Sequence, residues 1–313
     1  MIVVLKVSLS YSQDLHIASV QEMNIWYNPA LKTTKIPQVY TSFRNVNYPN
    51  IIAYSSKAIG IDLPLIPRNT DISDITSYAN ITAGINTNSS KDGSMASSTA
   101  MIALTYALPL NRNDTYISIG FNGCYNFNRI GTGIYNYYPS QFDKQGAIGS
   151  AIIADPYLSG YNFGYFTSSA GVAVYHNGED NQWYAGVSTR NFNHPFTEWN
   201  RSSRLESSTG VQGGYSTAIN DVGTIRGYAN FNWHGAVSEH YFAVAYTRII
   251  DDSASYKIGA GIGYRWEDAI VPSLELTLKR SRLNLYYDIN FPGTLYNLYS
   301  RKSLTFSYSY TFK

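Results

Sequence analysis

Apolar and polar residues alternate without interruption over the last eleven residues, Ser303 to Lys313. The apolar positions of this stretch are Leu304, Phe306, Tyr308, Tyr310 and Phe312. Because successive side chains of a β-strand point to opposite faces, the pattern predicts a strand with one apolar and one wet face. The stretch is about as long as a tilted strand that crosses a bilayer. A long amphipathic strand of a soluble β protein is the alternative that this stretch alone leaves open.

The same alternation continues along most of the chain from residue 38. In residues 258–266, for example, apolar residues alternate with three glycines and an arginine. Each such segment has one face suited to lipid and one small or polar face, and no helical periodicity is comparably regular. We predict strands over residues 38–45, 54–64, 77–88, 97–110, 114–127, 167–177, 181–192, 207–219, 222–233, 237–250, 254–266, 270–279, 281–290 and 302–313.

The connections between these fourteen predicted strands are of two kinds. Those that follow odd-numbered strands include the longest, over about 128–166, 193–206 and 291–301. Those that follow even-numbered strands are mostly short and carry turn residues such as Gly178-Glu179-Asp180. Short periplasmic turns and longer extracellular loops are typical of outer-membrane barrels. The sequence therefore predicts an all-β fold, an antiparallel transmembrane β-barrel of the outer-membrane type.

Composition agrees with a membrane location. Charged residues make up 14% of the 313 residues, whereas about 25% is usual in soluble domains. The chain holds 29 tyrosines, whose amphipathic rings suit a membrane interface. The formal net charge of +2 is too small to indicate a nucleic-acid partner. No run of 18 apolar residues occurs, so no transmembrane helix is predicted.

The N-terminal part of the chain differs from the rest. Residues 1–12 have an apolar centre, one lysine and small residues, which is typical of the end of a secretory signal peptide; an ordinary first strand is the alternative. Residues 13–37 show no regular period, and we predict that they form a separate segment folded inside the barrel. Residues 38–313 would then form the barrel itself.

Several short motifs follow one another in a characteristic order. The first are Ser12-Gln13-Asp14, then Trp26-Tyr27-Asn28-Pro29-Ala30-Leu31, then Ser42-Phe43-Arg44-Asn45 with Pro49. The middle of the chain carries Asp155-Pro156-Tyr157-Leu158 and a hairpin from Ala170-Gly171-Val172-Ala173-Val174-Tyr175 into Tyr184-Ala185-Gly186-Val187-Ser188. The last third carries Gly263-Tyr264-Arg265 with Asp268-Ala269, then Tyr287-Asp288-Ile289-Asn290 before the closing strand.

In this order and spacing the chain resembles the PorP/SprF proteins of the type IX secretion system of Bacteroidota. One departure is that Val46, Asn47 and Tyr48 stand where the family has a glutamine and a tryptophan. The resemblance implies a barrel of the cell outer membrane that helps particular secreted proteins leave the cell or holds them at its surface. The implied partners are outer-membrane lipid, a secreted protein with a C-terminal targeting domain, and other components of the secretion or gliding machinery. No cofactor is implied.

The candidate partner-binding or structural residues are Asn28, Pro29, Arg44, Asp155, Pro156, Arg265 and Asp288. An arginine that faces mid-bilayer lipid costs about 2–4 kcal/mol. Arg265, in phase with the glycines before it, should therefore face the lumen, with Glu275 and Asp288 available as partners. Arg248 is in phase with apolar residues, and we expect it to reach the interface from a strand end.

Two further predictions concern surfaces. Gly259, Gly261 and Gly263 form a small-residue patch against which the 13–37 segment could pack. The long connection over residues 128–166, with Asp155 and Pro156 as its anchor, is the predicted partner-binding surface. Both are interpretations of composition and position rather than of a specific motif.

Catalytic motifs are lacking in the sequence. None of the five histidines has a metal-binding spacing such as H-E-x-x-H, and no G-x-S-x-G stretch occurs. An outer-membrane lipid hydrolase would need a serine within hydrogen-bond reach of a histidine such as His176 or His240. We therefore predict a non-enzymatic secretion or anchoring component. A diffusion channel for small solutes is the main alternative, and an open or filled lumen distinguishes the two.

Overall fold

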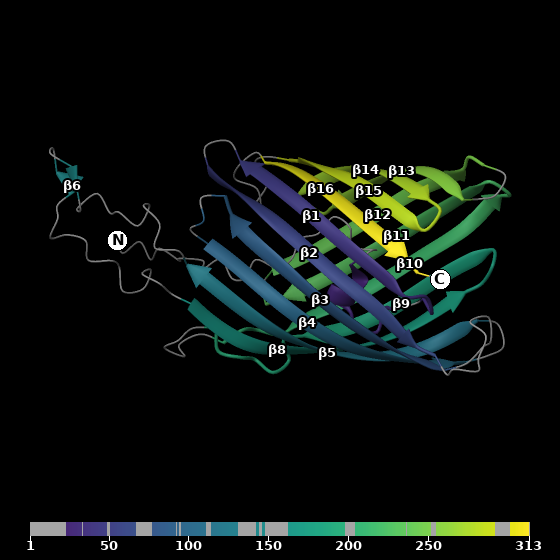
Figure 1. Ribbon diagram of the computed structural model, residues 1–313, viewed down its shortest axis with the longest axis horizontal. Helices are drawn as coiled ribbons and strands as arrows, with labels where there is room; N and C mark the ends of the chain where they lie inside the picture. The colour runs from purple at the N-terminus through teal and green to yellow at the C-terminus, as the bar shows by residue number, and fades with distance from the viewer. Residues whose placement is uncertain are drawn as a thin grey trace, which may run out of the picture.

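The computed structural model describes residues 23–32, 34–48, 51–66, 77–91, 93, 95–110, 114–130, 142–143, 146–147, 162–197, 204–235, 237–251, 255–291 and 301–312. Within these ranges fourteen antiparallel strands form a closed barrel, shown in Figure 1. Each strand pairs with its neighbours in the sequence, and β1 pairs with β16 to close the ring. Closure leaves no unpaired sheet edge, which the interior of a bilayer would not tolerate.

The barrel strands are β1 (Gln38–Tyr48), β2 (Ile51–Leu65), β3 (Tyr78–Ser90), β4 (Met95–Pro109), β5 (Thr115–Ile130), β8 (Asn162–Asn177), β9 (Asn181–Arg190), β10 (Ser208–Asn220), β11 (Gly223–His234), β12 (Val237–Ile249), β13 (Tyr256–Arg265), β14 (Ala269–Leu278), β15 (Ser281–Asn290) and β16 (Lys302–Thr311). A separate pair of two-residue strands, β6 (Phe142–Asp143) and β7 (Gly146–Ala147), lies between β5 and β8. One short helix, α1 (Asn24–Tyr27), precedes the barrel.

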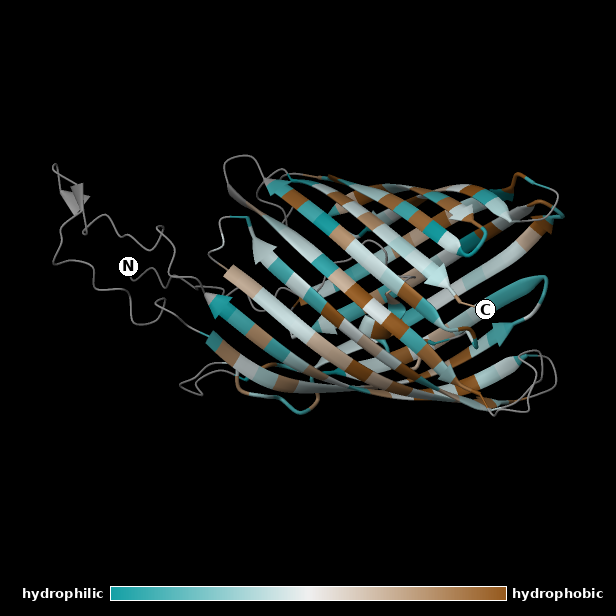
Figure 2. Cartoon of the chain, in the orientation of Figure 1, coloured by the Kyte–Doolittle hydropathy of each residue, from teal (hydrophilic) through white to brown (hydrophobic). Residues whose placement is uncertain are grey.

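The side chains alternate between the lumen and the outside, as the sequence pattern predicts. In β16, Leu304 and Phe306 are exposed, while Ser303, Thr305 and Ser307 are buried. Figure 2 shows the result as alternating hydrophobic and hydrophilic blocks along the strands. A polar inside and an apolar outside is the arrangement of a barrel in a membrane rather than of a soluble protein. The predicted all-β transmembrane barrel with fourteen strands is confirmed.

Short turns occur at both ends of the barrel, but its two longest connections, from β5 to β8 and from β9 to β10, both lie at the end where β1 finishes. Between the described strands, β8 and β9 are separated by three residues and β10 and β11 by two, with both turns at the end where β1 begins and β16 finishes. By the usual arrangement of outer-membrane barrels this is the periplasmic end. None of the helices that the structure describes is long and apolar enough to cross a membrane.

Candidate functional site

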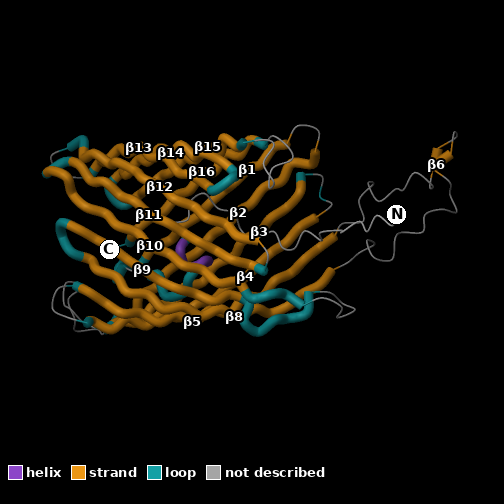
Figure 3. The backbone as a smooth tube through the Cα atoms, turned by 180° about the vertical axis from the view of Figure 1, so that it is seen from behind, coloured by secondary structure: helices purple, strands orange, loops and turns teal. Residues whose placement is uncertain are grey.

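A segment of the chain lies inside the barrel. Residues 23–32, which we call the lumenal segment, consist of α1 and the turn that follows it, and Figure 3 shows the helix within the ring of strands. Met23 and Ile25 are buried in a cluster with Tyr40 of β1 and Met101 of β4. The apolar residues of this segment thus pack on inward-facing apolar residues that interrupt an otherwise polar lumen.

The backbone of the turn is hydrogen-bonded to the barrel wall. Ser188 of β9 donates to the Tyr27 carbonyl at 2.9 Å. Thr105 of β4 donates to the Pro29 carbonyl at 2.6 Å, and Ser118 of β5 donates to the Ala30 carbonyl at 2.8 Å. Non-helical backbone at membrane depth needs such partners, because a buried carbonyl without one is costly.

The Asn28 side chain links the turn to the barrel wall. Its Nδ2 donates to the Val187 carbonyl at 3.2 Å and to Oε1 of Gln212 at 3.0 Å. Its Oδ1 accepts a hydrogen bond from the Ala30 amide at 2.9 Å. Asn28 is completely buried, so both ends of its amide are satisfied where water cannot reach them.

Glycines on the inner wall allow this close approach. A Cβ on Gly120 of β5 would overlap the Pro29 carbonyl, and one on Gly171 of β8 would overlap Oδ1 of Asn28. A Cβ on Gly186 of β9 would come within 2.7 Å of Nδ2 of Asn28. These positions require glycine because the Pro29 backbone lies against Gly120 and the Asn28 side chain lies against the other two.

Contrary to the prediction for the 13–37 segment, none of its described residues, 23–32 and 34–37, is among the nearest neighbours of Gly259, Gly261 or Gly263. The atoms nearest to these three glycines belong to side chains and backbone of the adjacent strands β12 and β14, including the Tyr241 ring beside Gly263. The glycine spacing on β13 makes room for neighbouring strands. The turn residues Asn28 to Ala30 lie instead against the wall formed by β4, β5, β8 and β9.

A cluster of ion pairs occupies the opposite part of the lumen. Oδ2 of Asp288 on β15 accepts hydrogen bonds from Nη2 of Arg44 on β1 and from Nη1 of Arg265 on β13, both at 3.0 Å. Arg44 and Asp288 are almost completely buried. Charges so far from water are tolerated only when they are paired.

The cluster extends from Arg265 to acidic residues nearer the rim. Arg265 pairs with Asp268 at 2.9 Å and with Glu239 of β12 at 3.3 Å, and Arg301 also pairs with Asp268. Three arginines thus meet three carboxylates among the described residues. We call Arg44, Glu239, Arg265, Asp268, Asp288 and Arg301 the ion cluster. It joins β1, β12, β13 and β15 across the point where the barrel closes.

Two smaller charged groups lie toward the periplasmic end. Nζ of Lys32, at the end of the lumenal segment, pairs with Asp62 of β2 at 2.7 Å. Arg226 of β11 and Arg282 of β15 both contact the same oxygen of Glu275 on β14. Glu275 was predicted as an available partner of Arg265, but the structure gives it to these two arginines instead.

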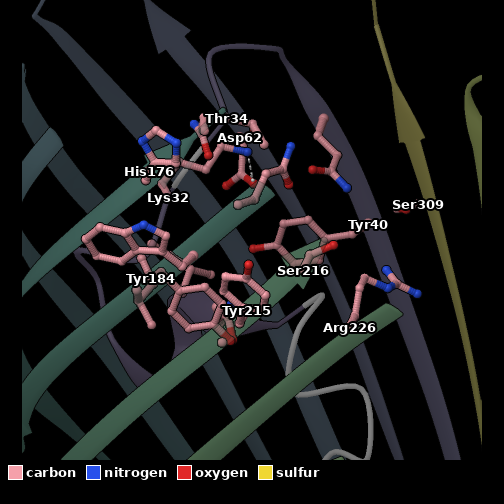
Figure 4. A pocket seen from close by; sticks show the side chains of 18 of the residues that line it. Lys32, Thr34, Tyr40, Asp62, His176, Tyr184, Tyr215, Ser216, Arg226 and Ser309 are labelled. Carbon is pink, nitrogen blue, oxygen red and sulfur yellow. Dashed lines mark hydrogen bonds and ion pairs between the residues drawn. The ribbon is translucent and has the colours of Figure 1, made fainter. Parts of the chain in front are cut away.

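A polar cavity of about 260 Å³ lies between the lumenal segment and the periplasmic end. Its walls include Lys32, Tyr40, Asp62, Arg226 and Arg282. In Figure 4 Lys32 and Asp62 lie on one side of the cavity and Arg226 on the other. The cavity is larger than a single water needs.

Five of the seven candidate residues lie in the lumen, in two groups. Asn28 and Pro29 belong to the lumenal segment, whereas Arg44, Arg265 and Asp288 belong to the ion cluster. Asp155 and Pro156 lie outside the described residues, as does most of the 128–166 connection. Arg248 is exposed on the outward face at the periplasmic end of β12, where an interfacial arginine was expected.

Sequence reasoning missed the wall residues that hold the segment and several members of the ion cluster. These are Asp62, Thr105, Ser118, Ser188, Gln212, Glu239, Asp268 and Arg301. The alternation of inward and outward positions could have identified some of them as lumenal. Asp62, for example, lies between the outward-facing Ile61 and Leu63 and so must face the lumen. The alternation along a strand does not show which of the many lumenal hydroxyls donates a hydrogen bond to the segment, because that depends on three-dimensional position.

The histidines of the described part of the chain are neither hydrogen-bonded to a serine nor part of a cluster of metal-ligating side chains. There Nδ1 of His176 lies 3.0 Å from the Thr115 hydroxyl, and His240 packs against Phe231 and Trp233. No serine–histidine hydrogen bond occurs among the described residues, and no three of their metal-ligating side chains are grouped to hold an ion.

Comparison with known proteins adds the family. A family model described as type IX secretion system membrane protein PorP/SprF matches residues 25–312. The chain belongs to the PorP/SprF family. The resemblance in the sequence motifs is therefore confirmed, and the PorP/SprF family is not a known enzyme class. None of the curated proteins matches the chain.

Solved structures share the fold. The toluene transporter TodX from Pseudomonas putida has a TM-score of 0.53 at 8% identity, covering 91% of each chain. The monoaromatic hydrocarbon channel CymD has a TM-score of 0.52 at 9% identity, covering 96% of this chain and 95% of CymD. At such low identity the likeness shows the fold alone. With its PorP/SprF membership, the fold places this protein in the outer membrane.

Proposed function

We propose that this PorP/SprF protein acts without catalysis, helping to secrete or surface-anchor a partner protein that carries a C-terminal targeting domain. The observation that carries the proposal is the lumenal segment. It crosses the space that a diffusing solute would need, and the hydrogen bonds and close-packed glycines around Asn28 and Pro29 hold it in place. A segment held across the lumen in this way supports a role in holding proteins rather than in passing small solutes. Family membership supplies the secretion context.

The partner would bind at the extracellular end, on the connection over residues 128–166. This connection is the longest between barrel strands and is rich in tyrosine and glycine, a composition suited to a protein-binding surface. The ion cluster lies at the same end of the barrel, where it ties together the strands around the closure. A rigid rim of this kind would hold a binding loop in place.

The test of this function is crosslinking of the intact protein in outer membranes, followed by purification and identification of what is attached. We expect one secreted protein with a C-terminal targeting domain, together with secretion-system components. Replacing residues 131–161 with a short linker should abolish this capture while the barrel still assembles. Capture by the loop-replaced barrel, or no captured protein from the intact one, would contradict the proposal.

A diffusion channel for small solutes is the second candidate. Two structures with the same fold are described as a toluene transporter and a monoaromatic hydrocarbon channel. The polar cavity shows that part of the lumen is open. This candidate requires a continuous path past the lumenal segment, and the conductance of the purified barrel decides between the two.

A further inference from the structure

We propose that the polar cavity at the periplasmic end binds a carboxylate of an acidic peptide segment, through Arg226 and Arg282. The cavity itself follows from the geometry of the described residues. Only the origin of the peptide, a protein handled by the secretion system, rests on the proposed function.

The charged side chains around the cavity are not balanced. Arg226 and Arg282 line the cavity together with Lys32 and Asp62. Both arginines are also ion-paired with Glu275. Within the described part of the chain, three permanent cations therefore face two carboxylates at this site. One positive charge is left over at this site, which favours an anionic ligand.

Arg226 and Arg282 share a single carboxylate, that of Glu275. The Nη2 atoms of both guanidinium groups point to the same oxygen of Glu275. Their Nε atoms are buried and have no hydrogen-bond partner among the described residues. A guanidinium has five N–H donors in a fork that matches a carboxylate. The pair thus retains donor capacity for a second carboxylate.

The Tyr40 side chain is buried, with an exposed fraction of 2%. Tyr40 lines the cavity, and its hydroxyl has no hydrogen-bond partner in the described structure. In Figure 4 its ring lies between Asp62 and Arg226. A buried hydroxyl is costly when it is left unpaired, and here it is a ready donor to a bound carboxylate.

The position of the cavity indicates a peptide rather than a lipid. The arginines point into the lumen, on the side of the barrel wall away from the bilayer, so lipid head groups do not reach them. Residues at the β8–β9 turn, Asn177 and Gln182, also line the cavity, which places it beside the periplasmic end. A chain entering from the periplasm would meet these two arginines before it reached the lumenal segment.

The test uses the purified full-length barrel in detergent and calorimetric titration at low salt. The probes are a hexaglutamate peptide with blocked ends, the matching hexaglutamine peptide, and free glutarate. We expect hexaglutamate to bind, hexaglutamine not to bind, and glutarate to bind at least about tenfold more weakly than hexaglutamate. Glutarate binding equal to that of hexaglutamate would overturn the assignment to a peptide, and binding of hexaglutamine would overturn the assignment to a carboxylate.

Variants of the barrel locate the binding. Arg282→Gln should weaken hexaglutamate binding about tenfold or more, the size of effect expected for a charged hydrogen bond. Arg248→Gln is the matched control, since it removes the same charge from an outward-facing position at the same end. Glu275→Gln should strengthen binding, because it removes the carboxylate that competes for both arginines.

Equal binding by the Arg282→Gln and Arg248→Gln variants, or weaker binding by Glu275→Gln, would reject the site. Tyr40→Phe removes a single hydroxyl and leaves the charges unchanged, so it tests the site even if Arg282→Gln fails to assemble. We expect several-fold weaker binding from it, and unchanged binding would count against the site. Because the titration contains no secreted partner, a negative result here together with partner capture from membranes would reject only the cavity.

Discussion

The two sides of the lumen are built from different chemistry. The side formed by β4, β5, β8 and β9, which we call the neutral side, meets the lumenal segment mainly with uncharged hydroxyls and glycines, although Arg190 of β9 lies over the Tyr27 ring. The side formed by β1, β13 and β15 is charged and carries the ion cluster. Tyr27 reaches between the two sides, since Ser188 holds its carbonyl while its ring packs with Tyr241 and Tyr286.

The difference shows how each side is held together. Neutral hydroxyls suit the first side because the backbone carbonyls of the turn need donors but carry no net charge. The ion cluster satisfies its own charges and joins strands that are distant in sequence, with Arg44 and Asp288 being 244 residues apart. We therefore expect changes on the charged side to affect barrel stability, and changes on the neutral side to affect the seating of the segment.

The largest effect is expected from Asp288→Asn. This change leaves Arg44 and Arg265 buried without the carboxylate that both contact, and breaking such a pair costs about 3–5 kcal/mol. Heat-modifiability on gels should show unfolding at a clearly lower temperature. The control is Glu179→Gln in an exposed turn, for which we expect about 0.5 kcal/mol or less. Equal melting of the two variants would contradict the role of the ion cluster.

The next effect is expected from Gly120→Ala, on the neutral side. The added Cβ would overlap the Pro29 carbonyl, and overpacking of this kind costs about 1–3 kcal/mol. The segment should be displaced, so residues 23–32 should become accessible to protease while the strands remain protected. Gly227→Ala is the control, because its nearest atom would lie at 3.8 Å. Protection of the segment in both variants would show that close packing at Gly120 does not hold it.

A somewhat smaller effect is expected from Asn28→Ala, which removes the bonds to Val187 and Gln212. The loss of buried hydrogen bonds costs about 1–3 kcal/mol. Hydrogen–deuterium exchange should become faster in the lumenal segment, with little change in the melting temperature of the barrel. Thr217→Ala, which loses only an exposed bond, should leave the exchange unchanged. Faster exchange throughout the barrel would contradict a separate role for the neutral side.

The smallest effect is expected from Glu239→Gln. The Glu239 side chain is 22% exposed and lies 3.3 Å from Arg265, which keeps its contacts to Asp268 and Asp288. We therefore expect a loss of about 1 kcal/mol or less. A melting shift as large as that of Asp288→Asn would show that the rim of the ion cluster matters as much as its buried centre.

The sequence predicted the barrel well because one rule, the period of two, governs every strand. The strand count and the lumenal position of Arg265 followed from the alternation of inward and outward positions and from the cost of a charge in lipid, whereas the choice of Asp288 over Glu275 as its partner did not. The same rule failed for the glycines. Gly120 and Gly261 both face inward, and only the folded structure shows that Pro29 lies against the first and a neighbouring strand against the second. Partners such as Arg301 come from connections, where no period applies.

The most direct test of the account is the conductance of the purified barrel in planar bilayers, with and without residues 13–37. If the lumenal segment closes the barrel, as we propose, the intact protein should give no steady open-pore current. Deletion of residues 13–37 should produce a large current, with the strands still assembled. A steady current from the intact barrel that the deletion leaves unchanged would contradict a filled lumen and favour the diffusion channel.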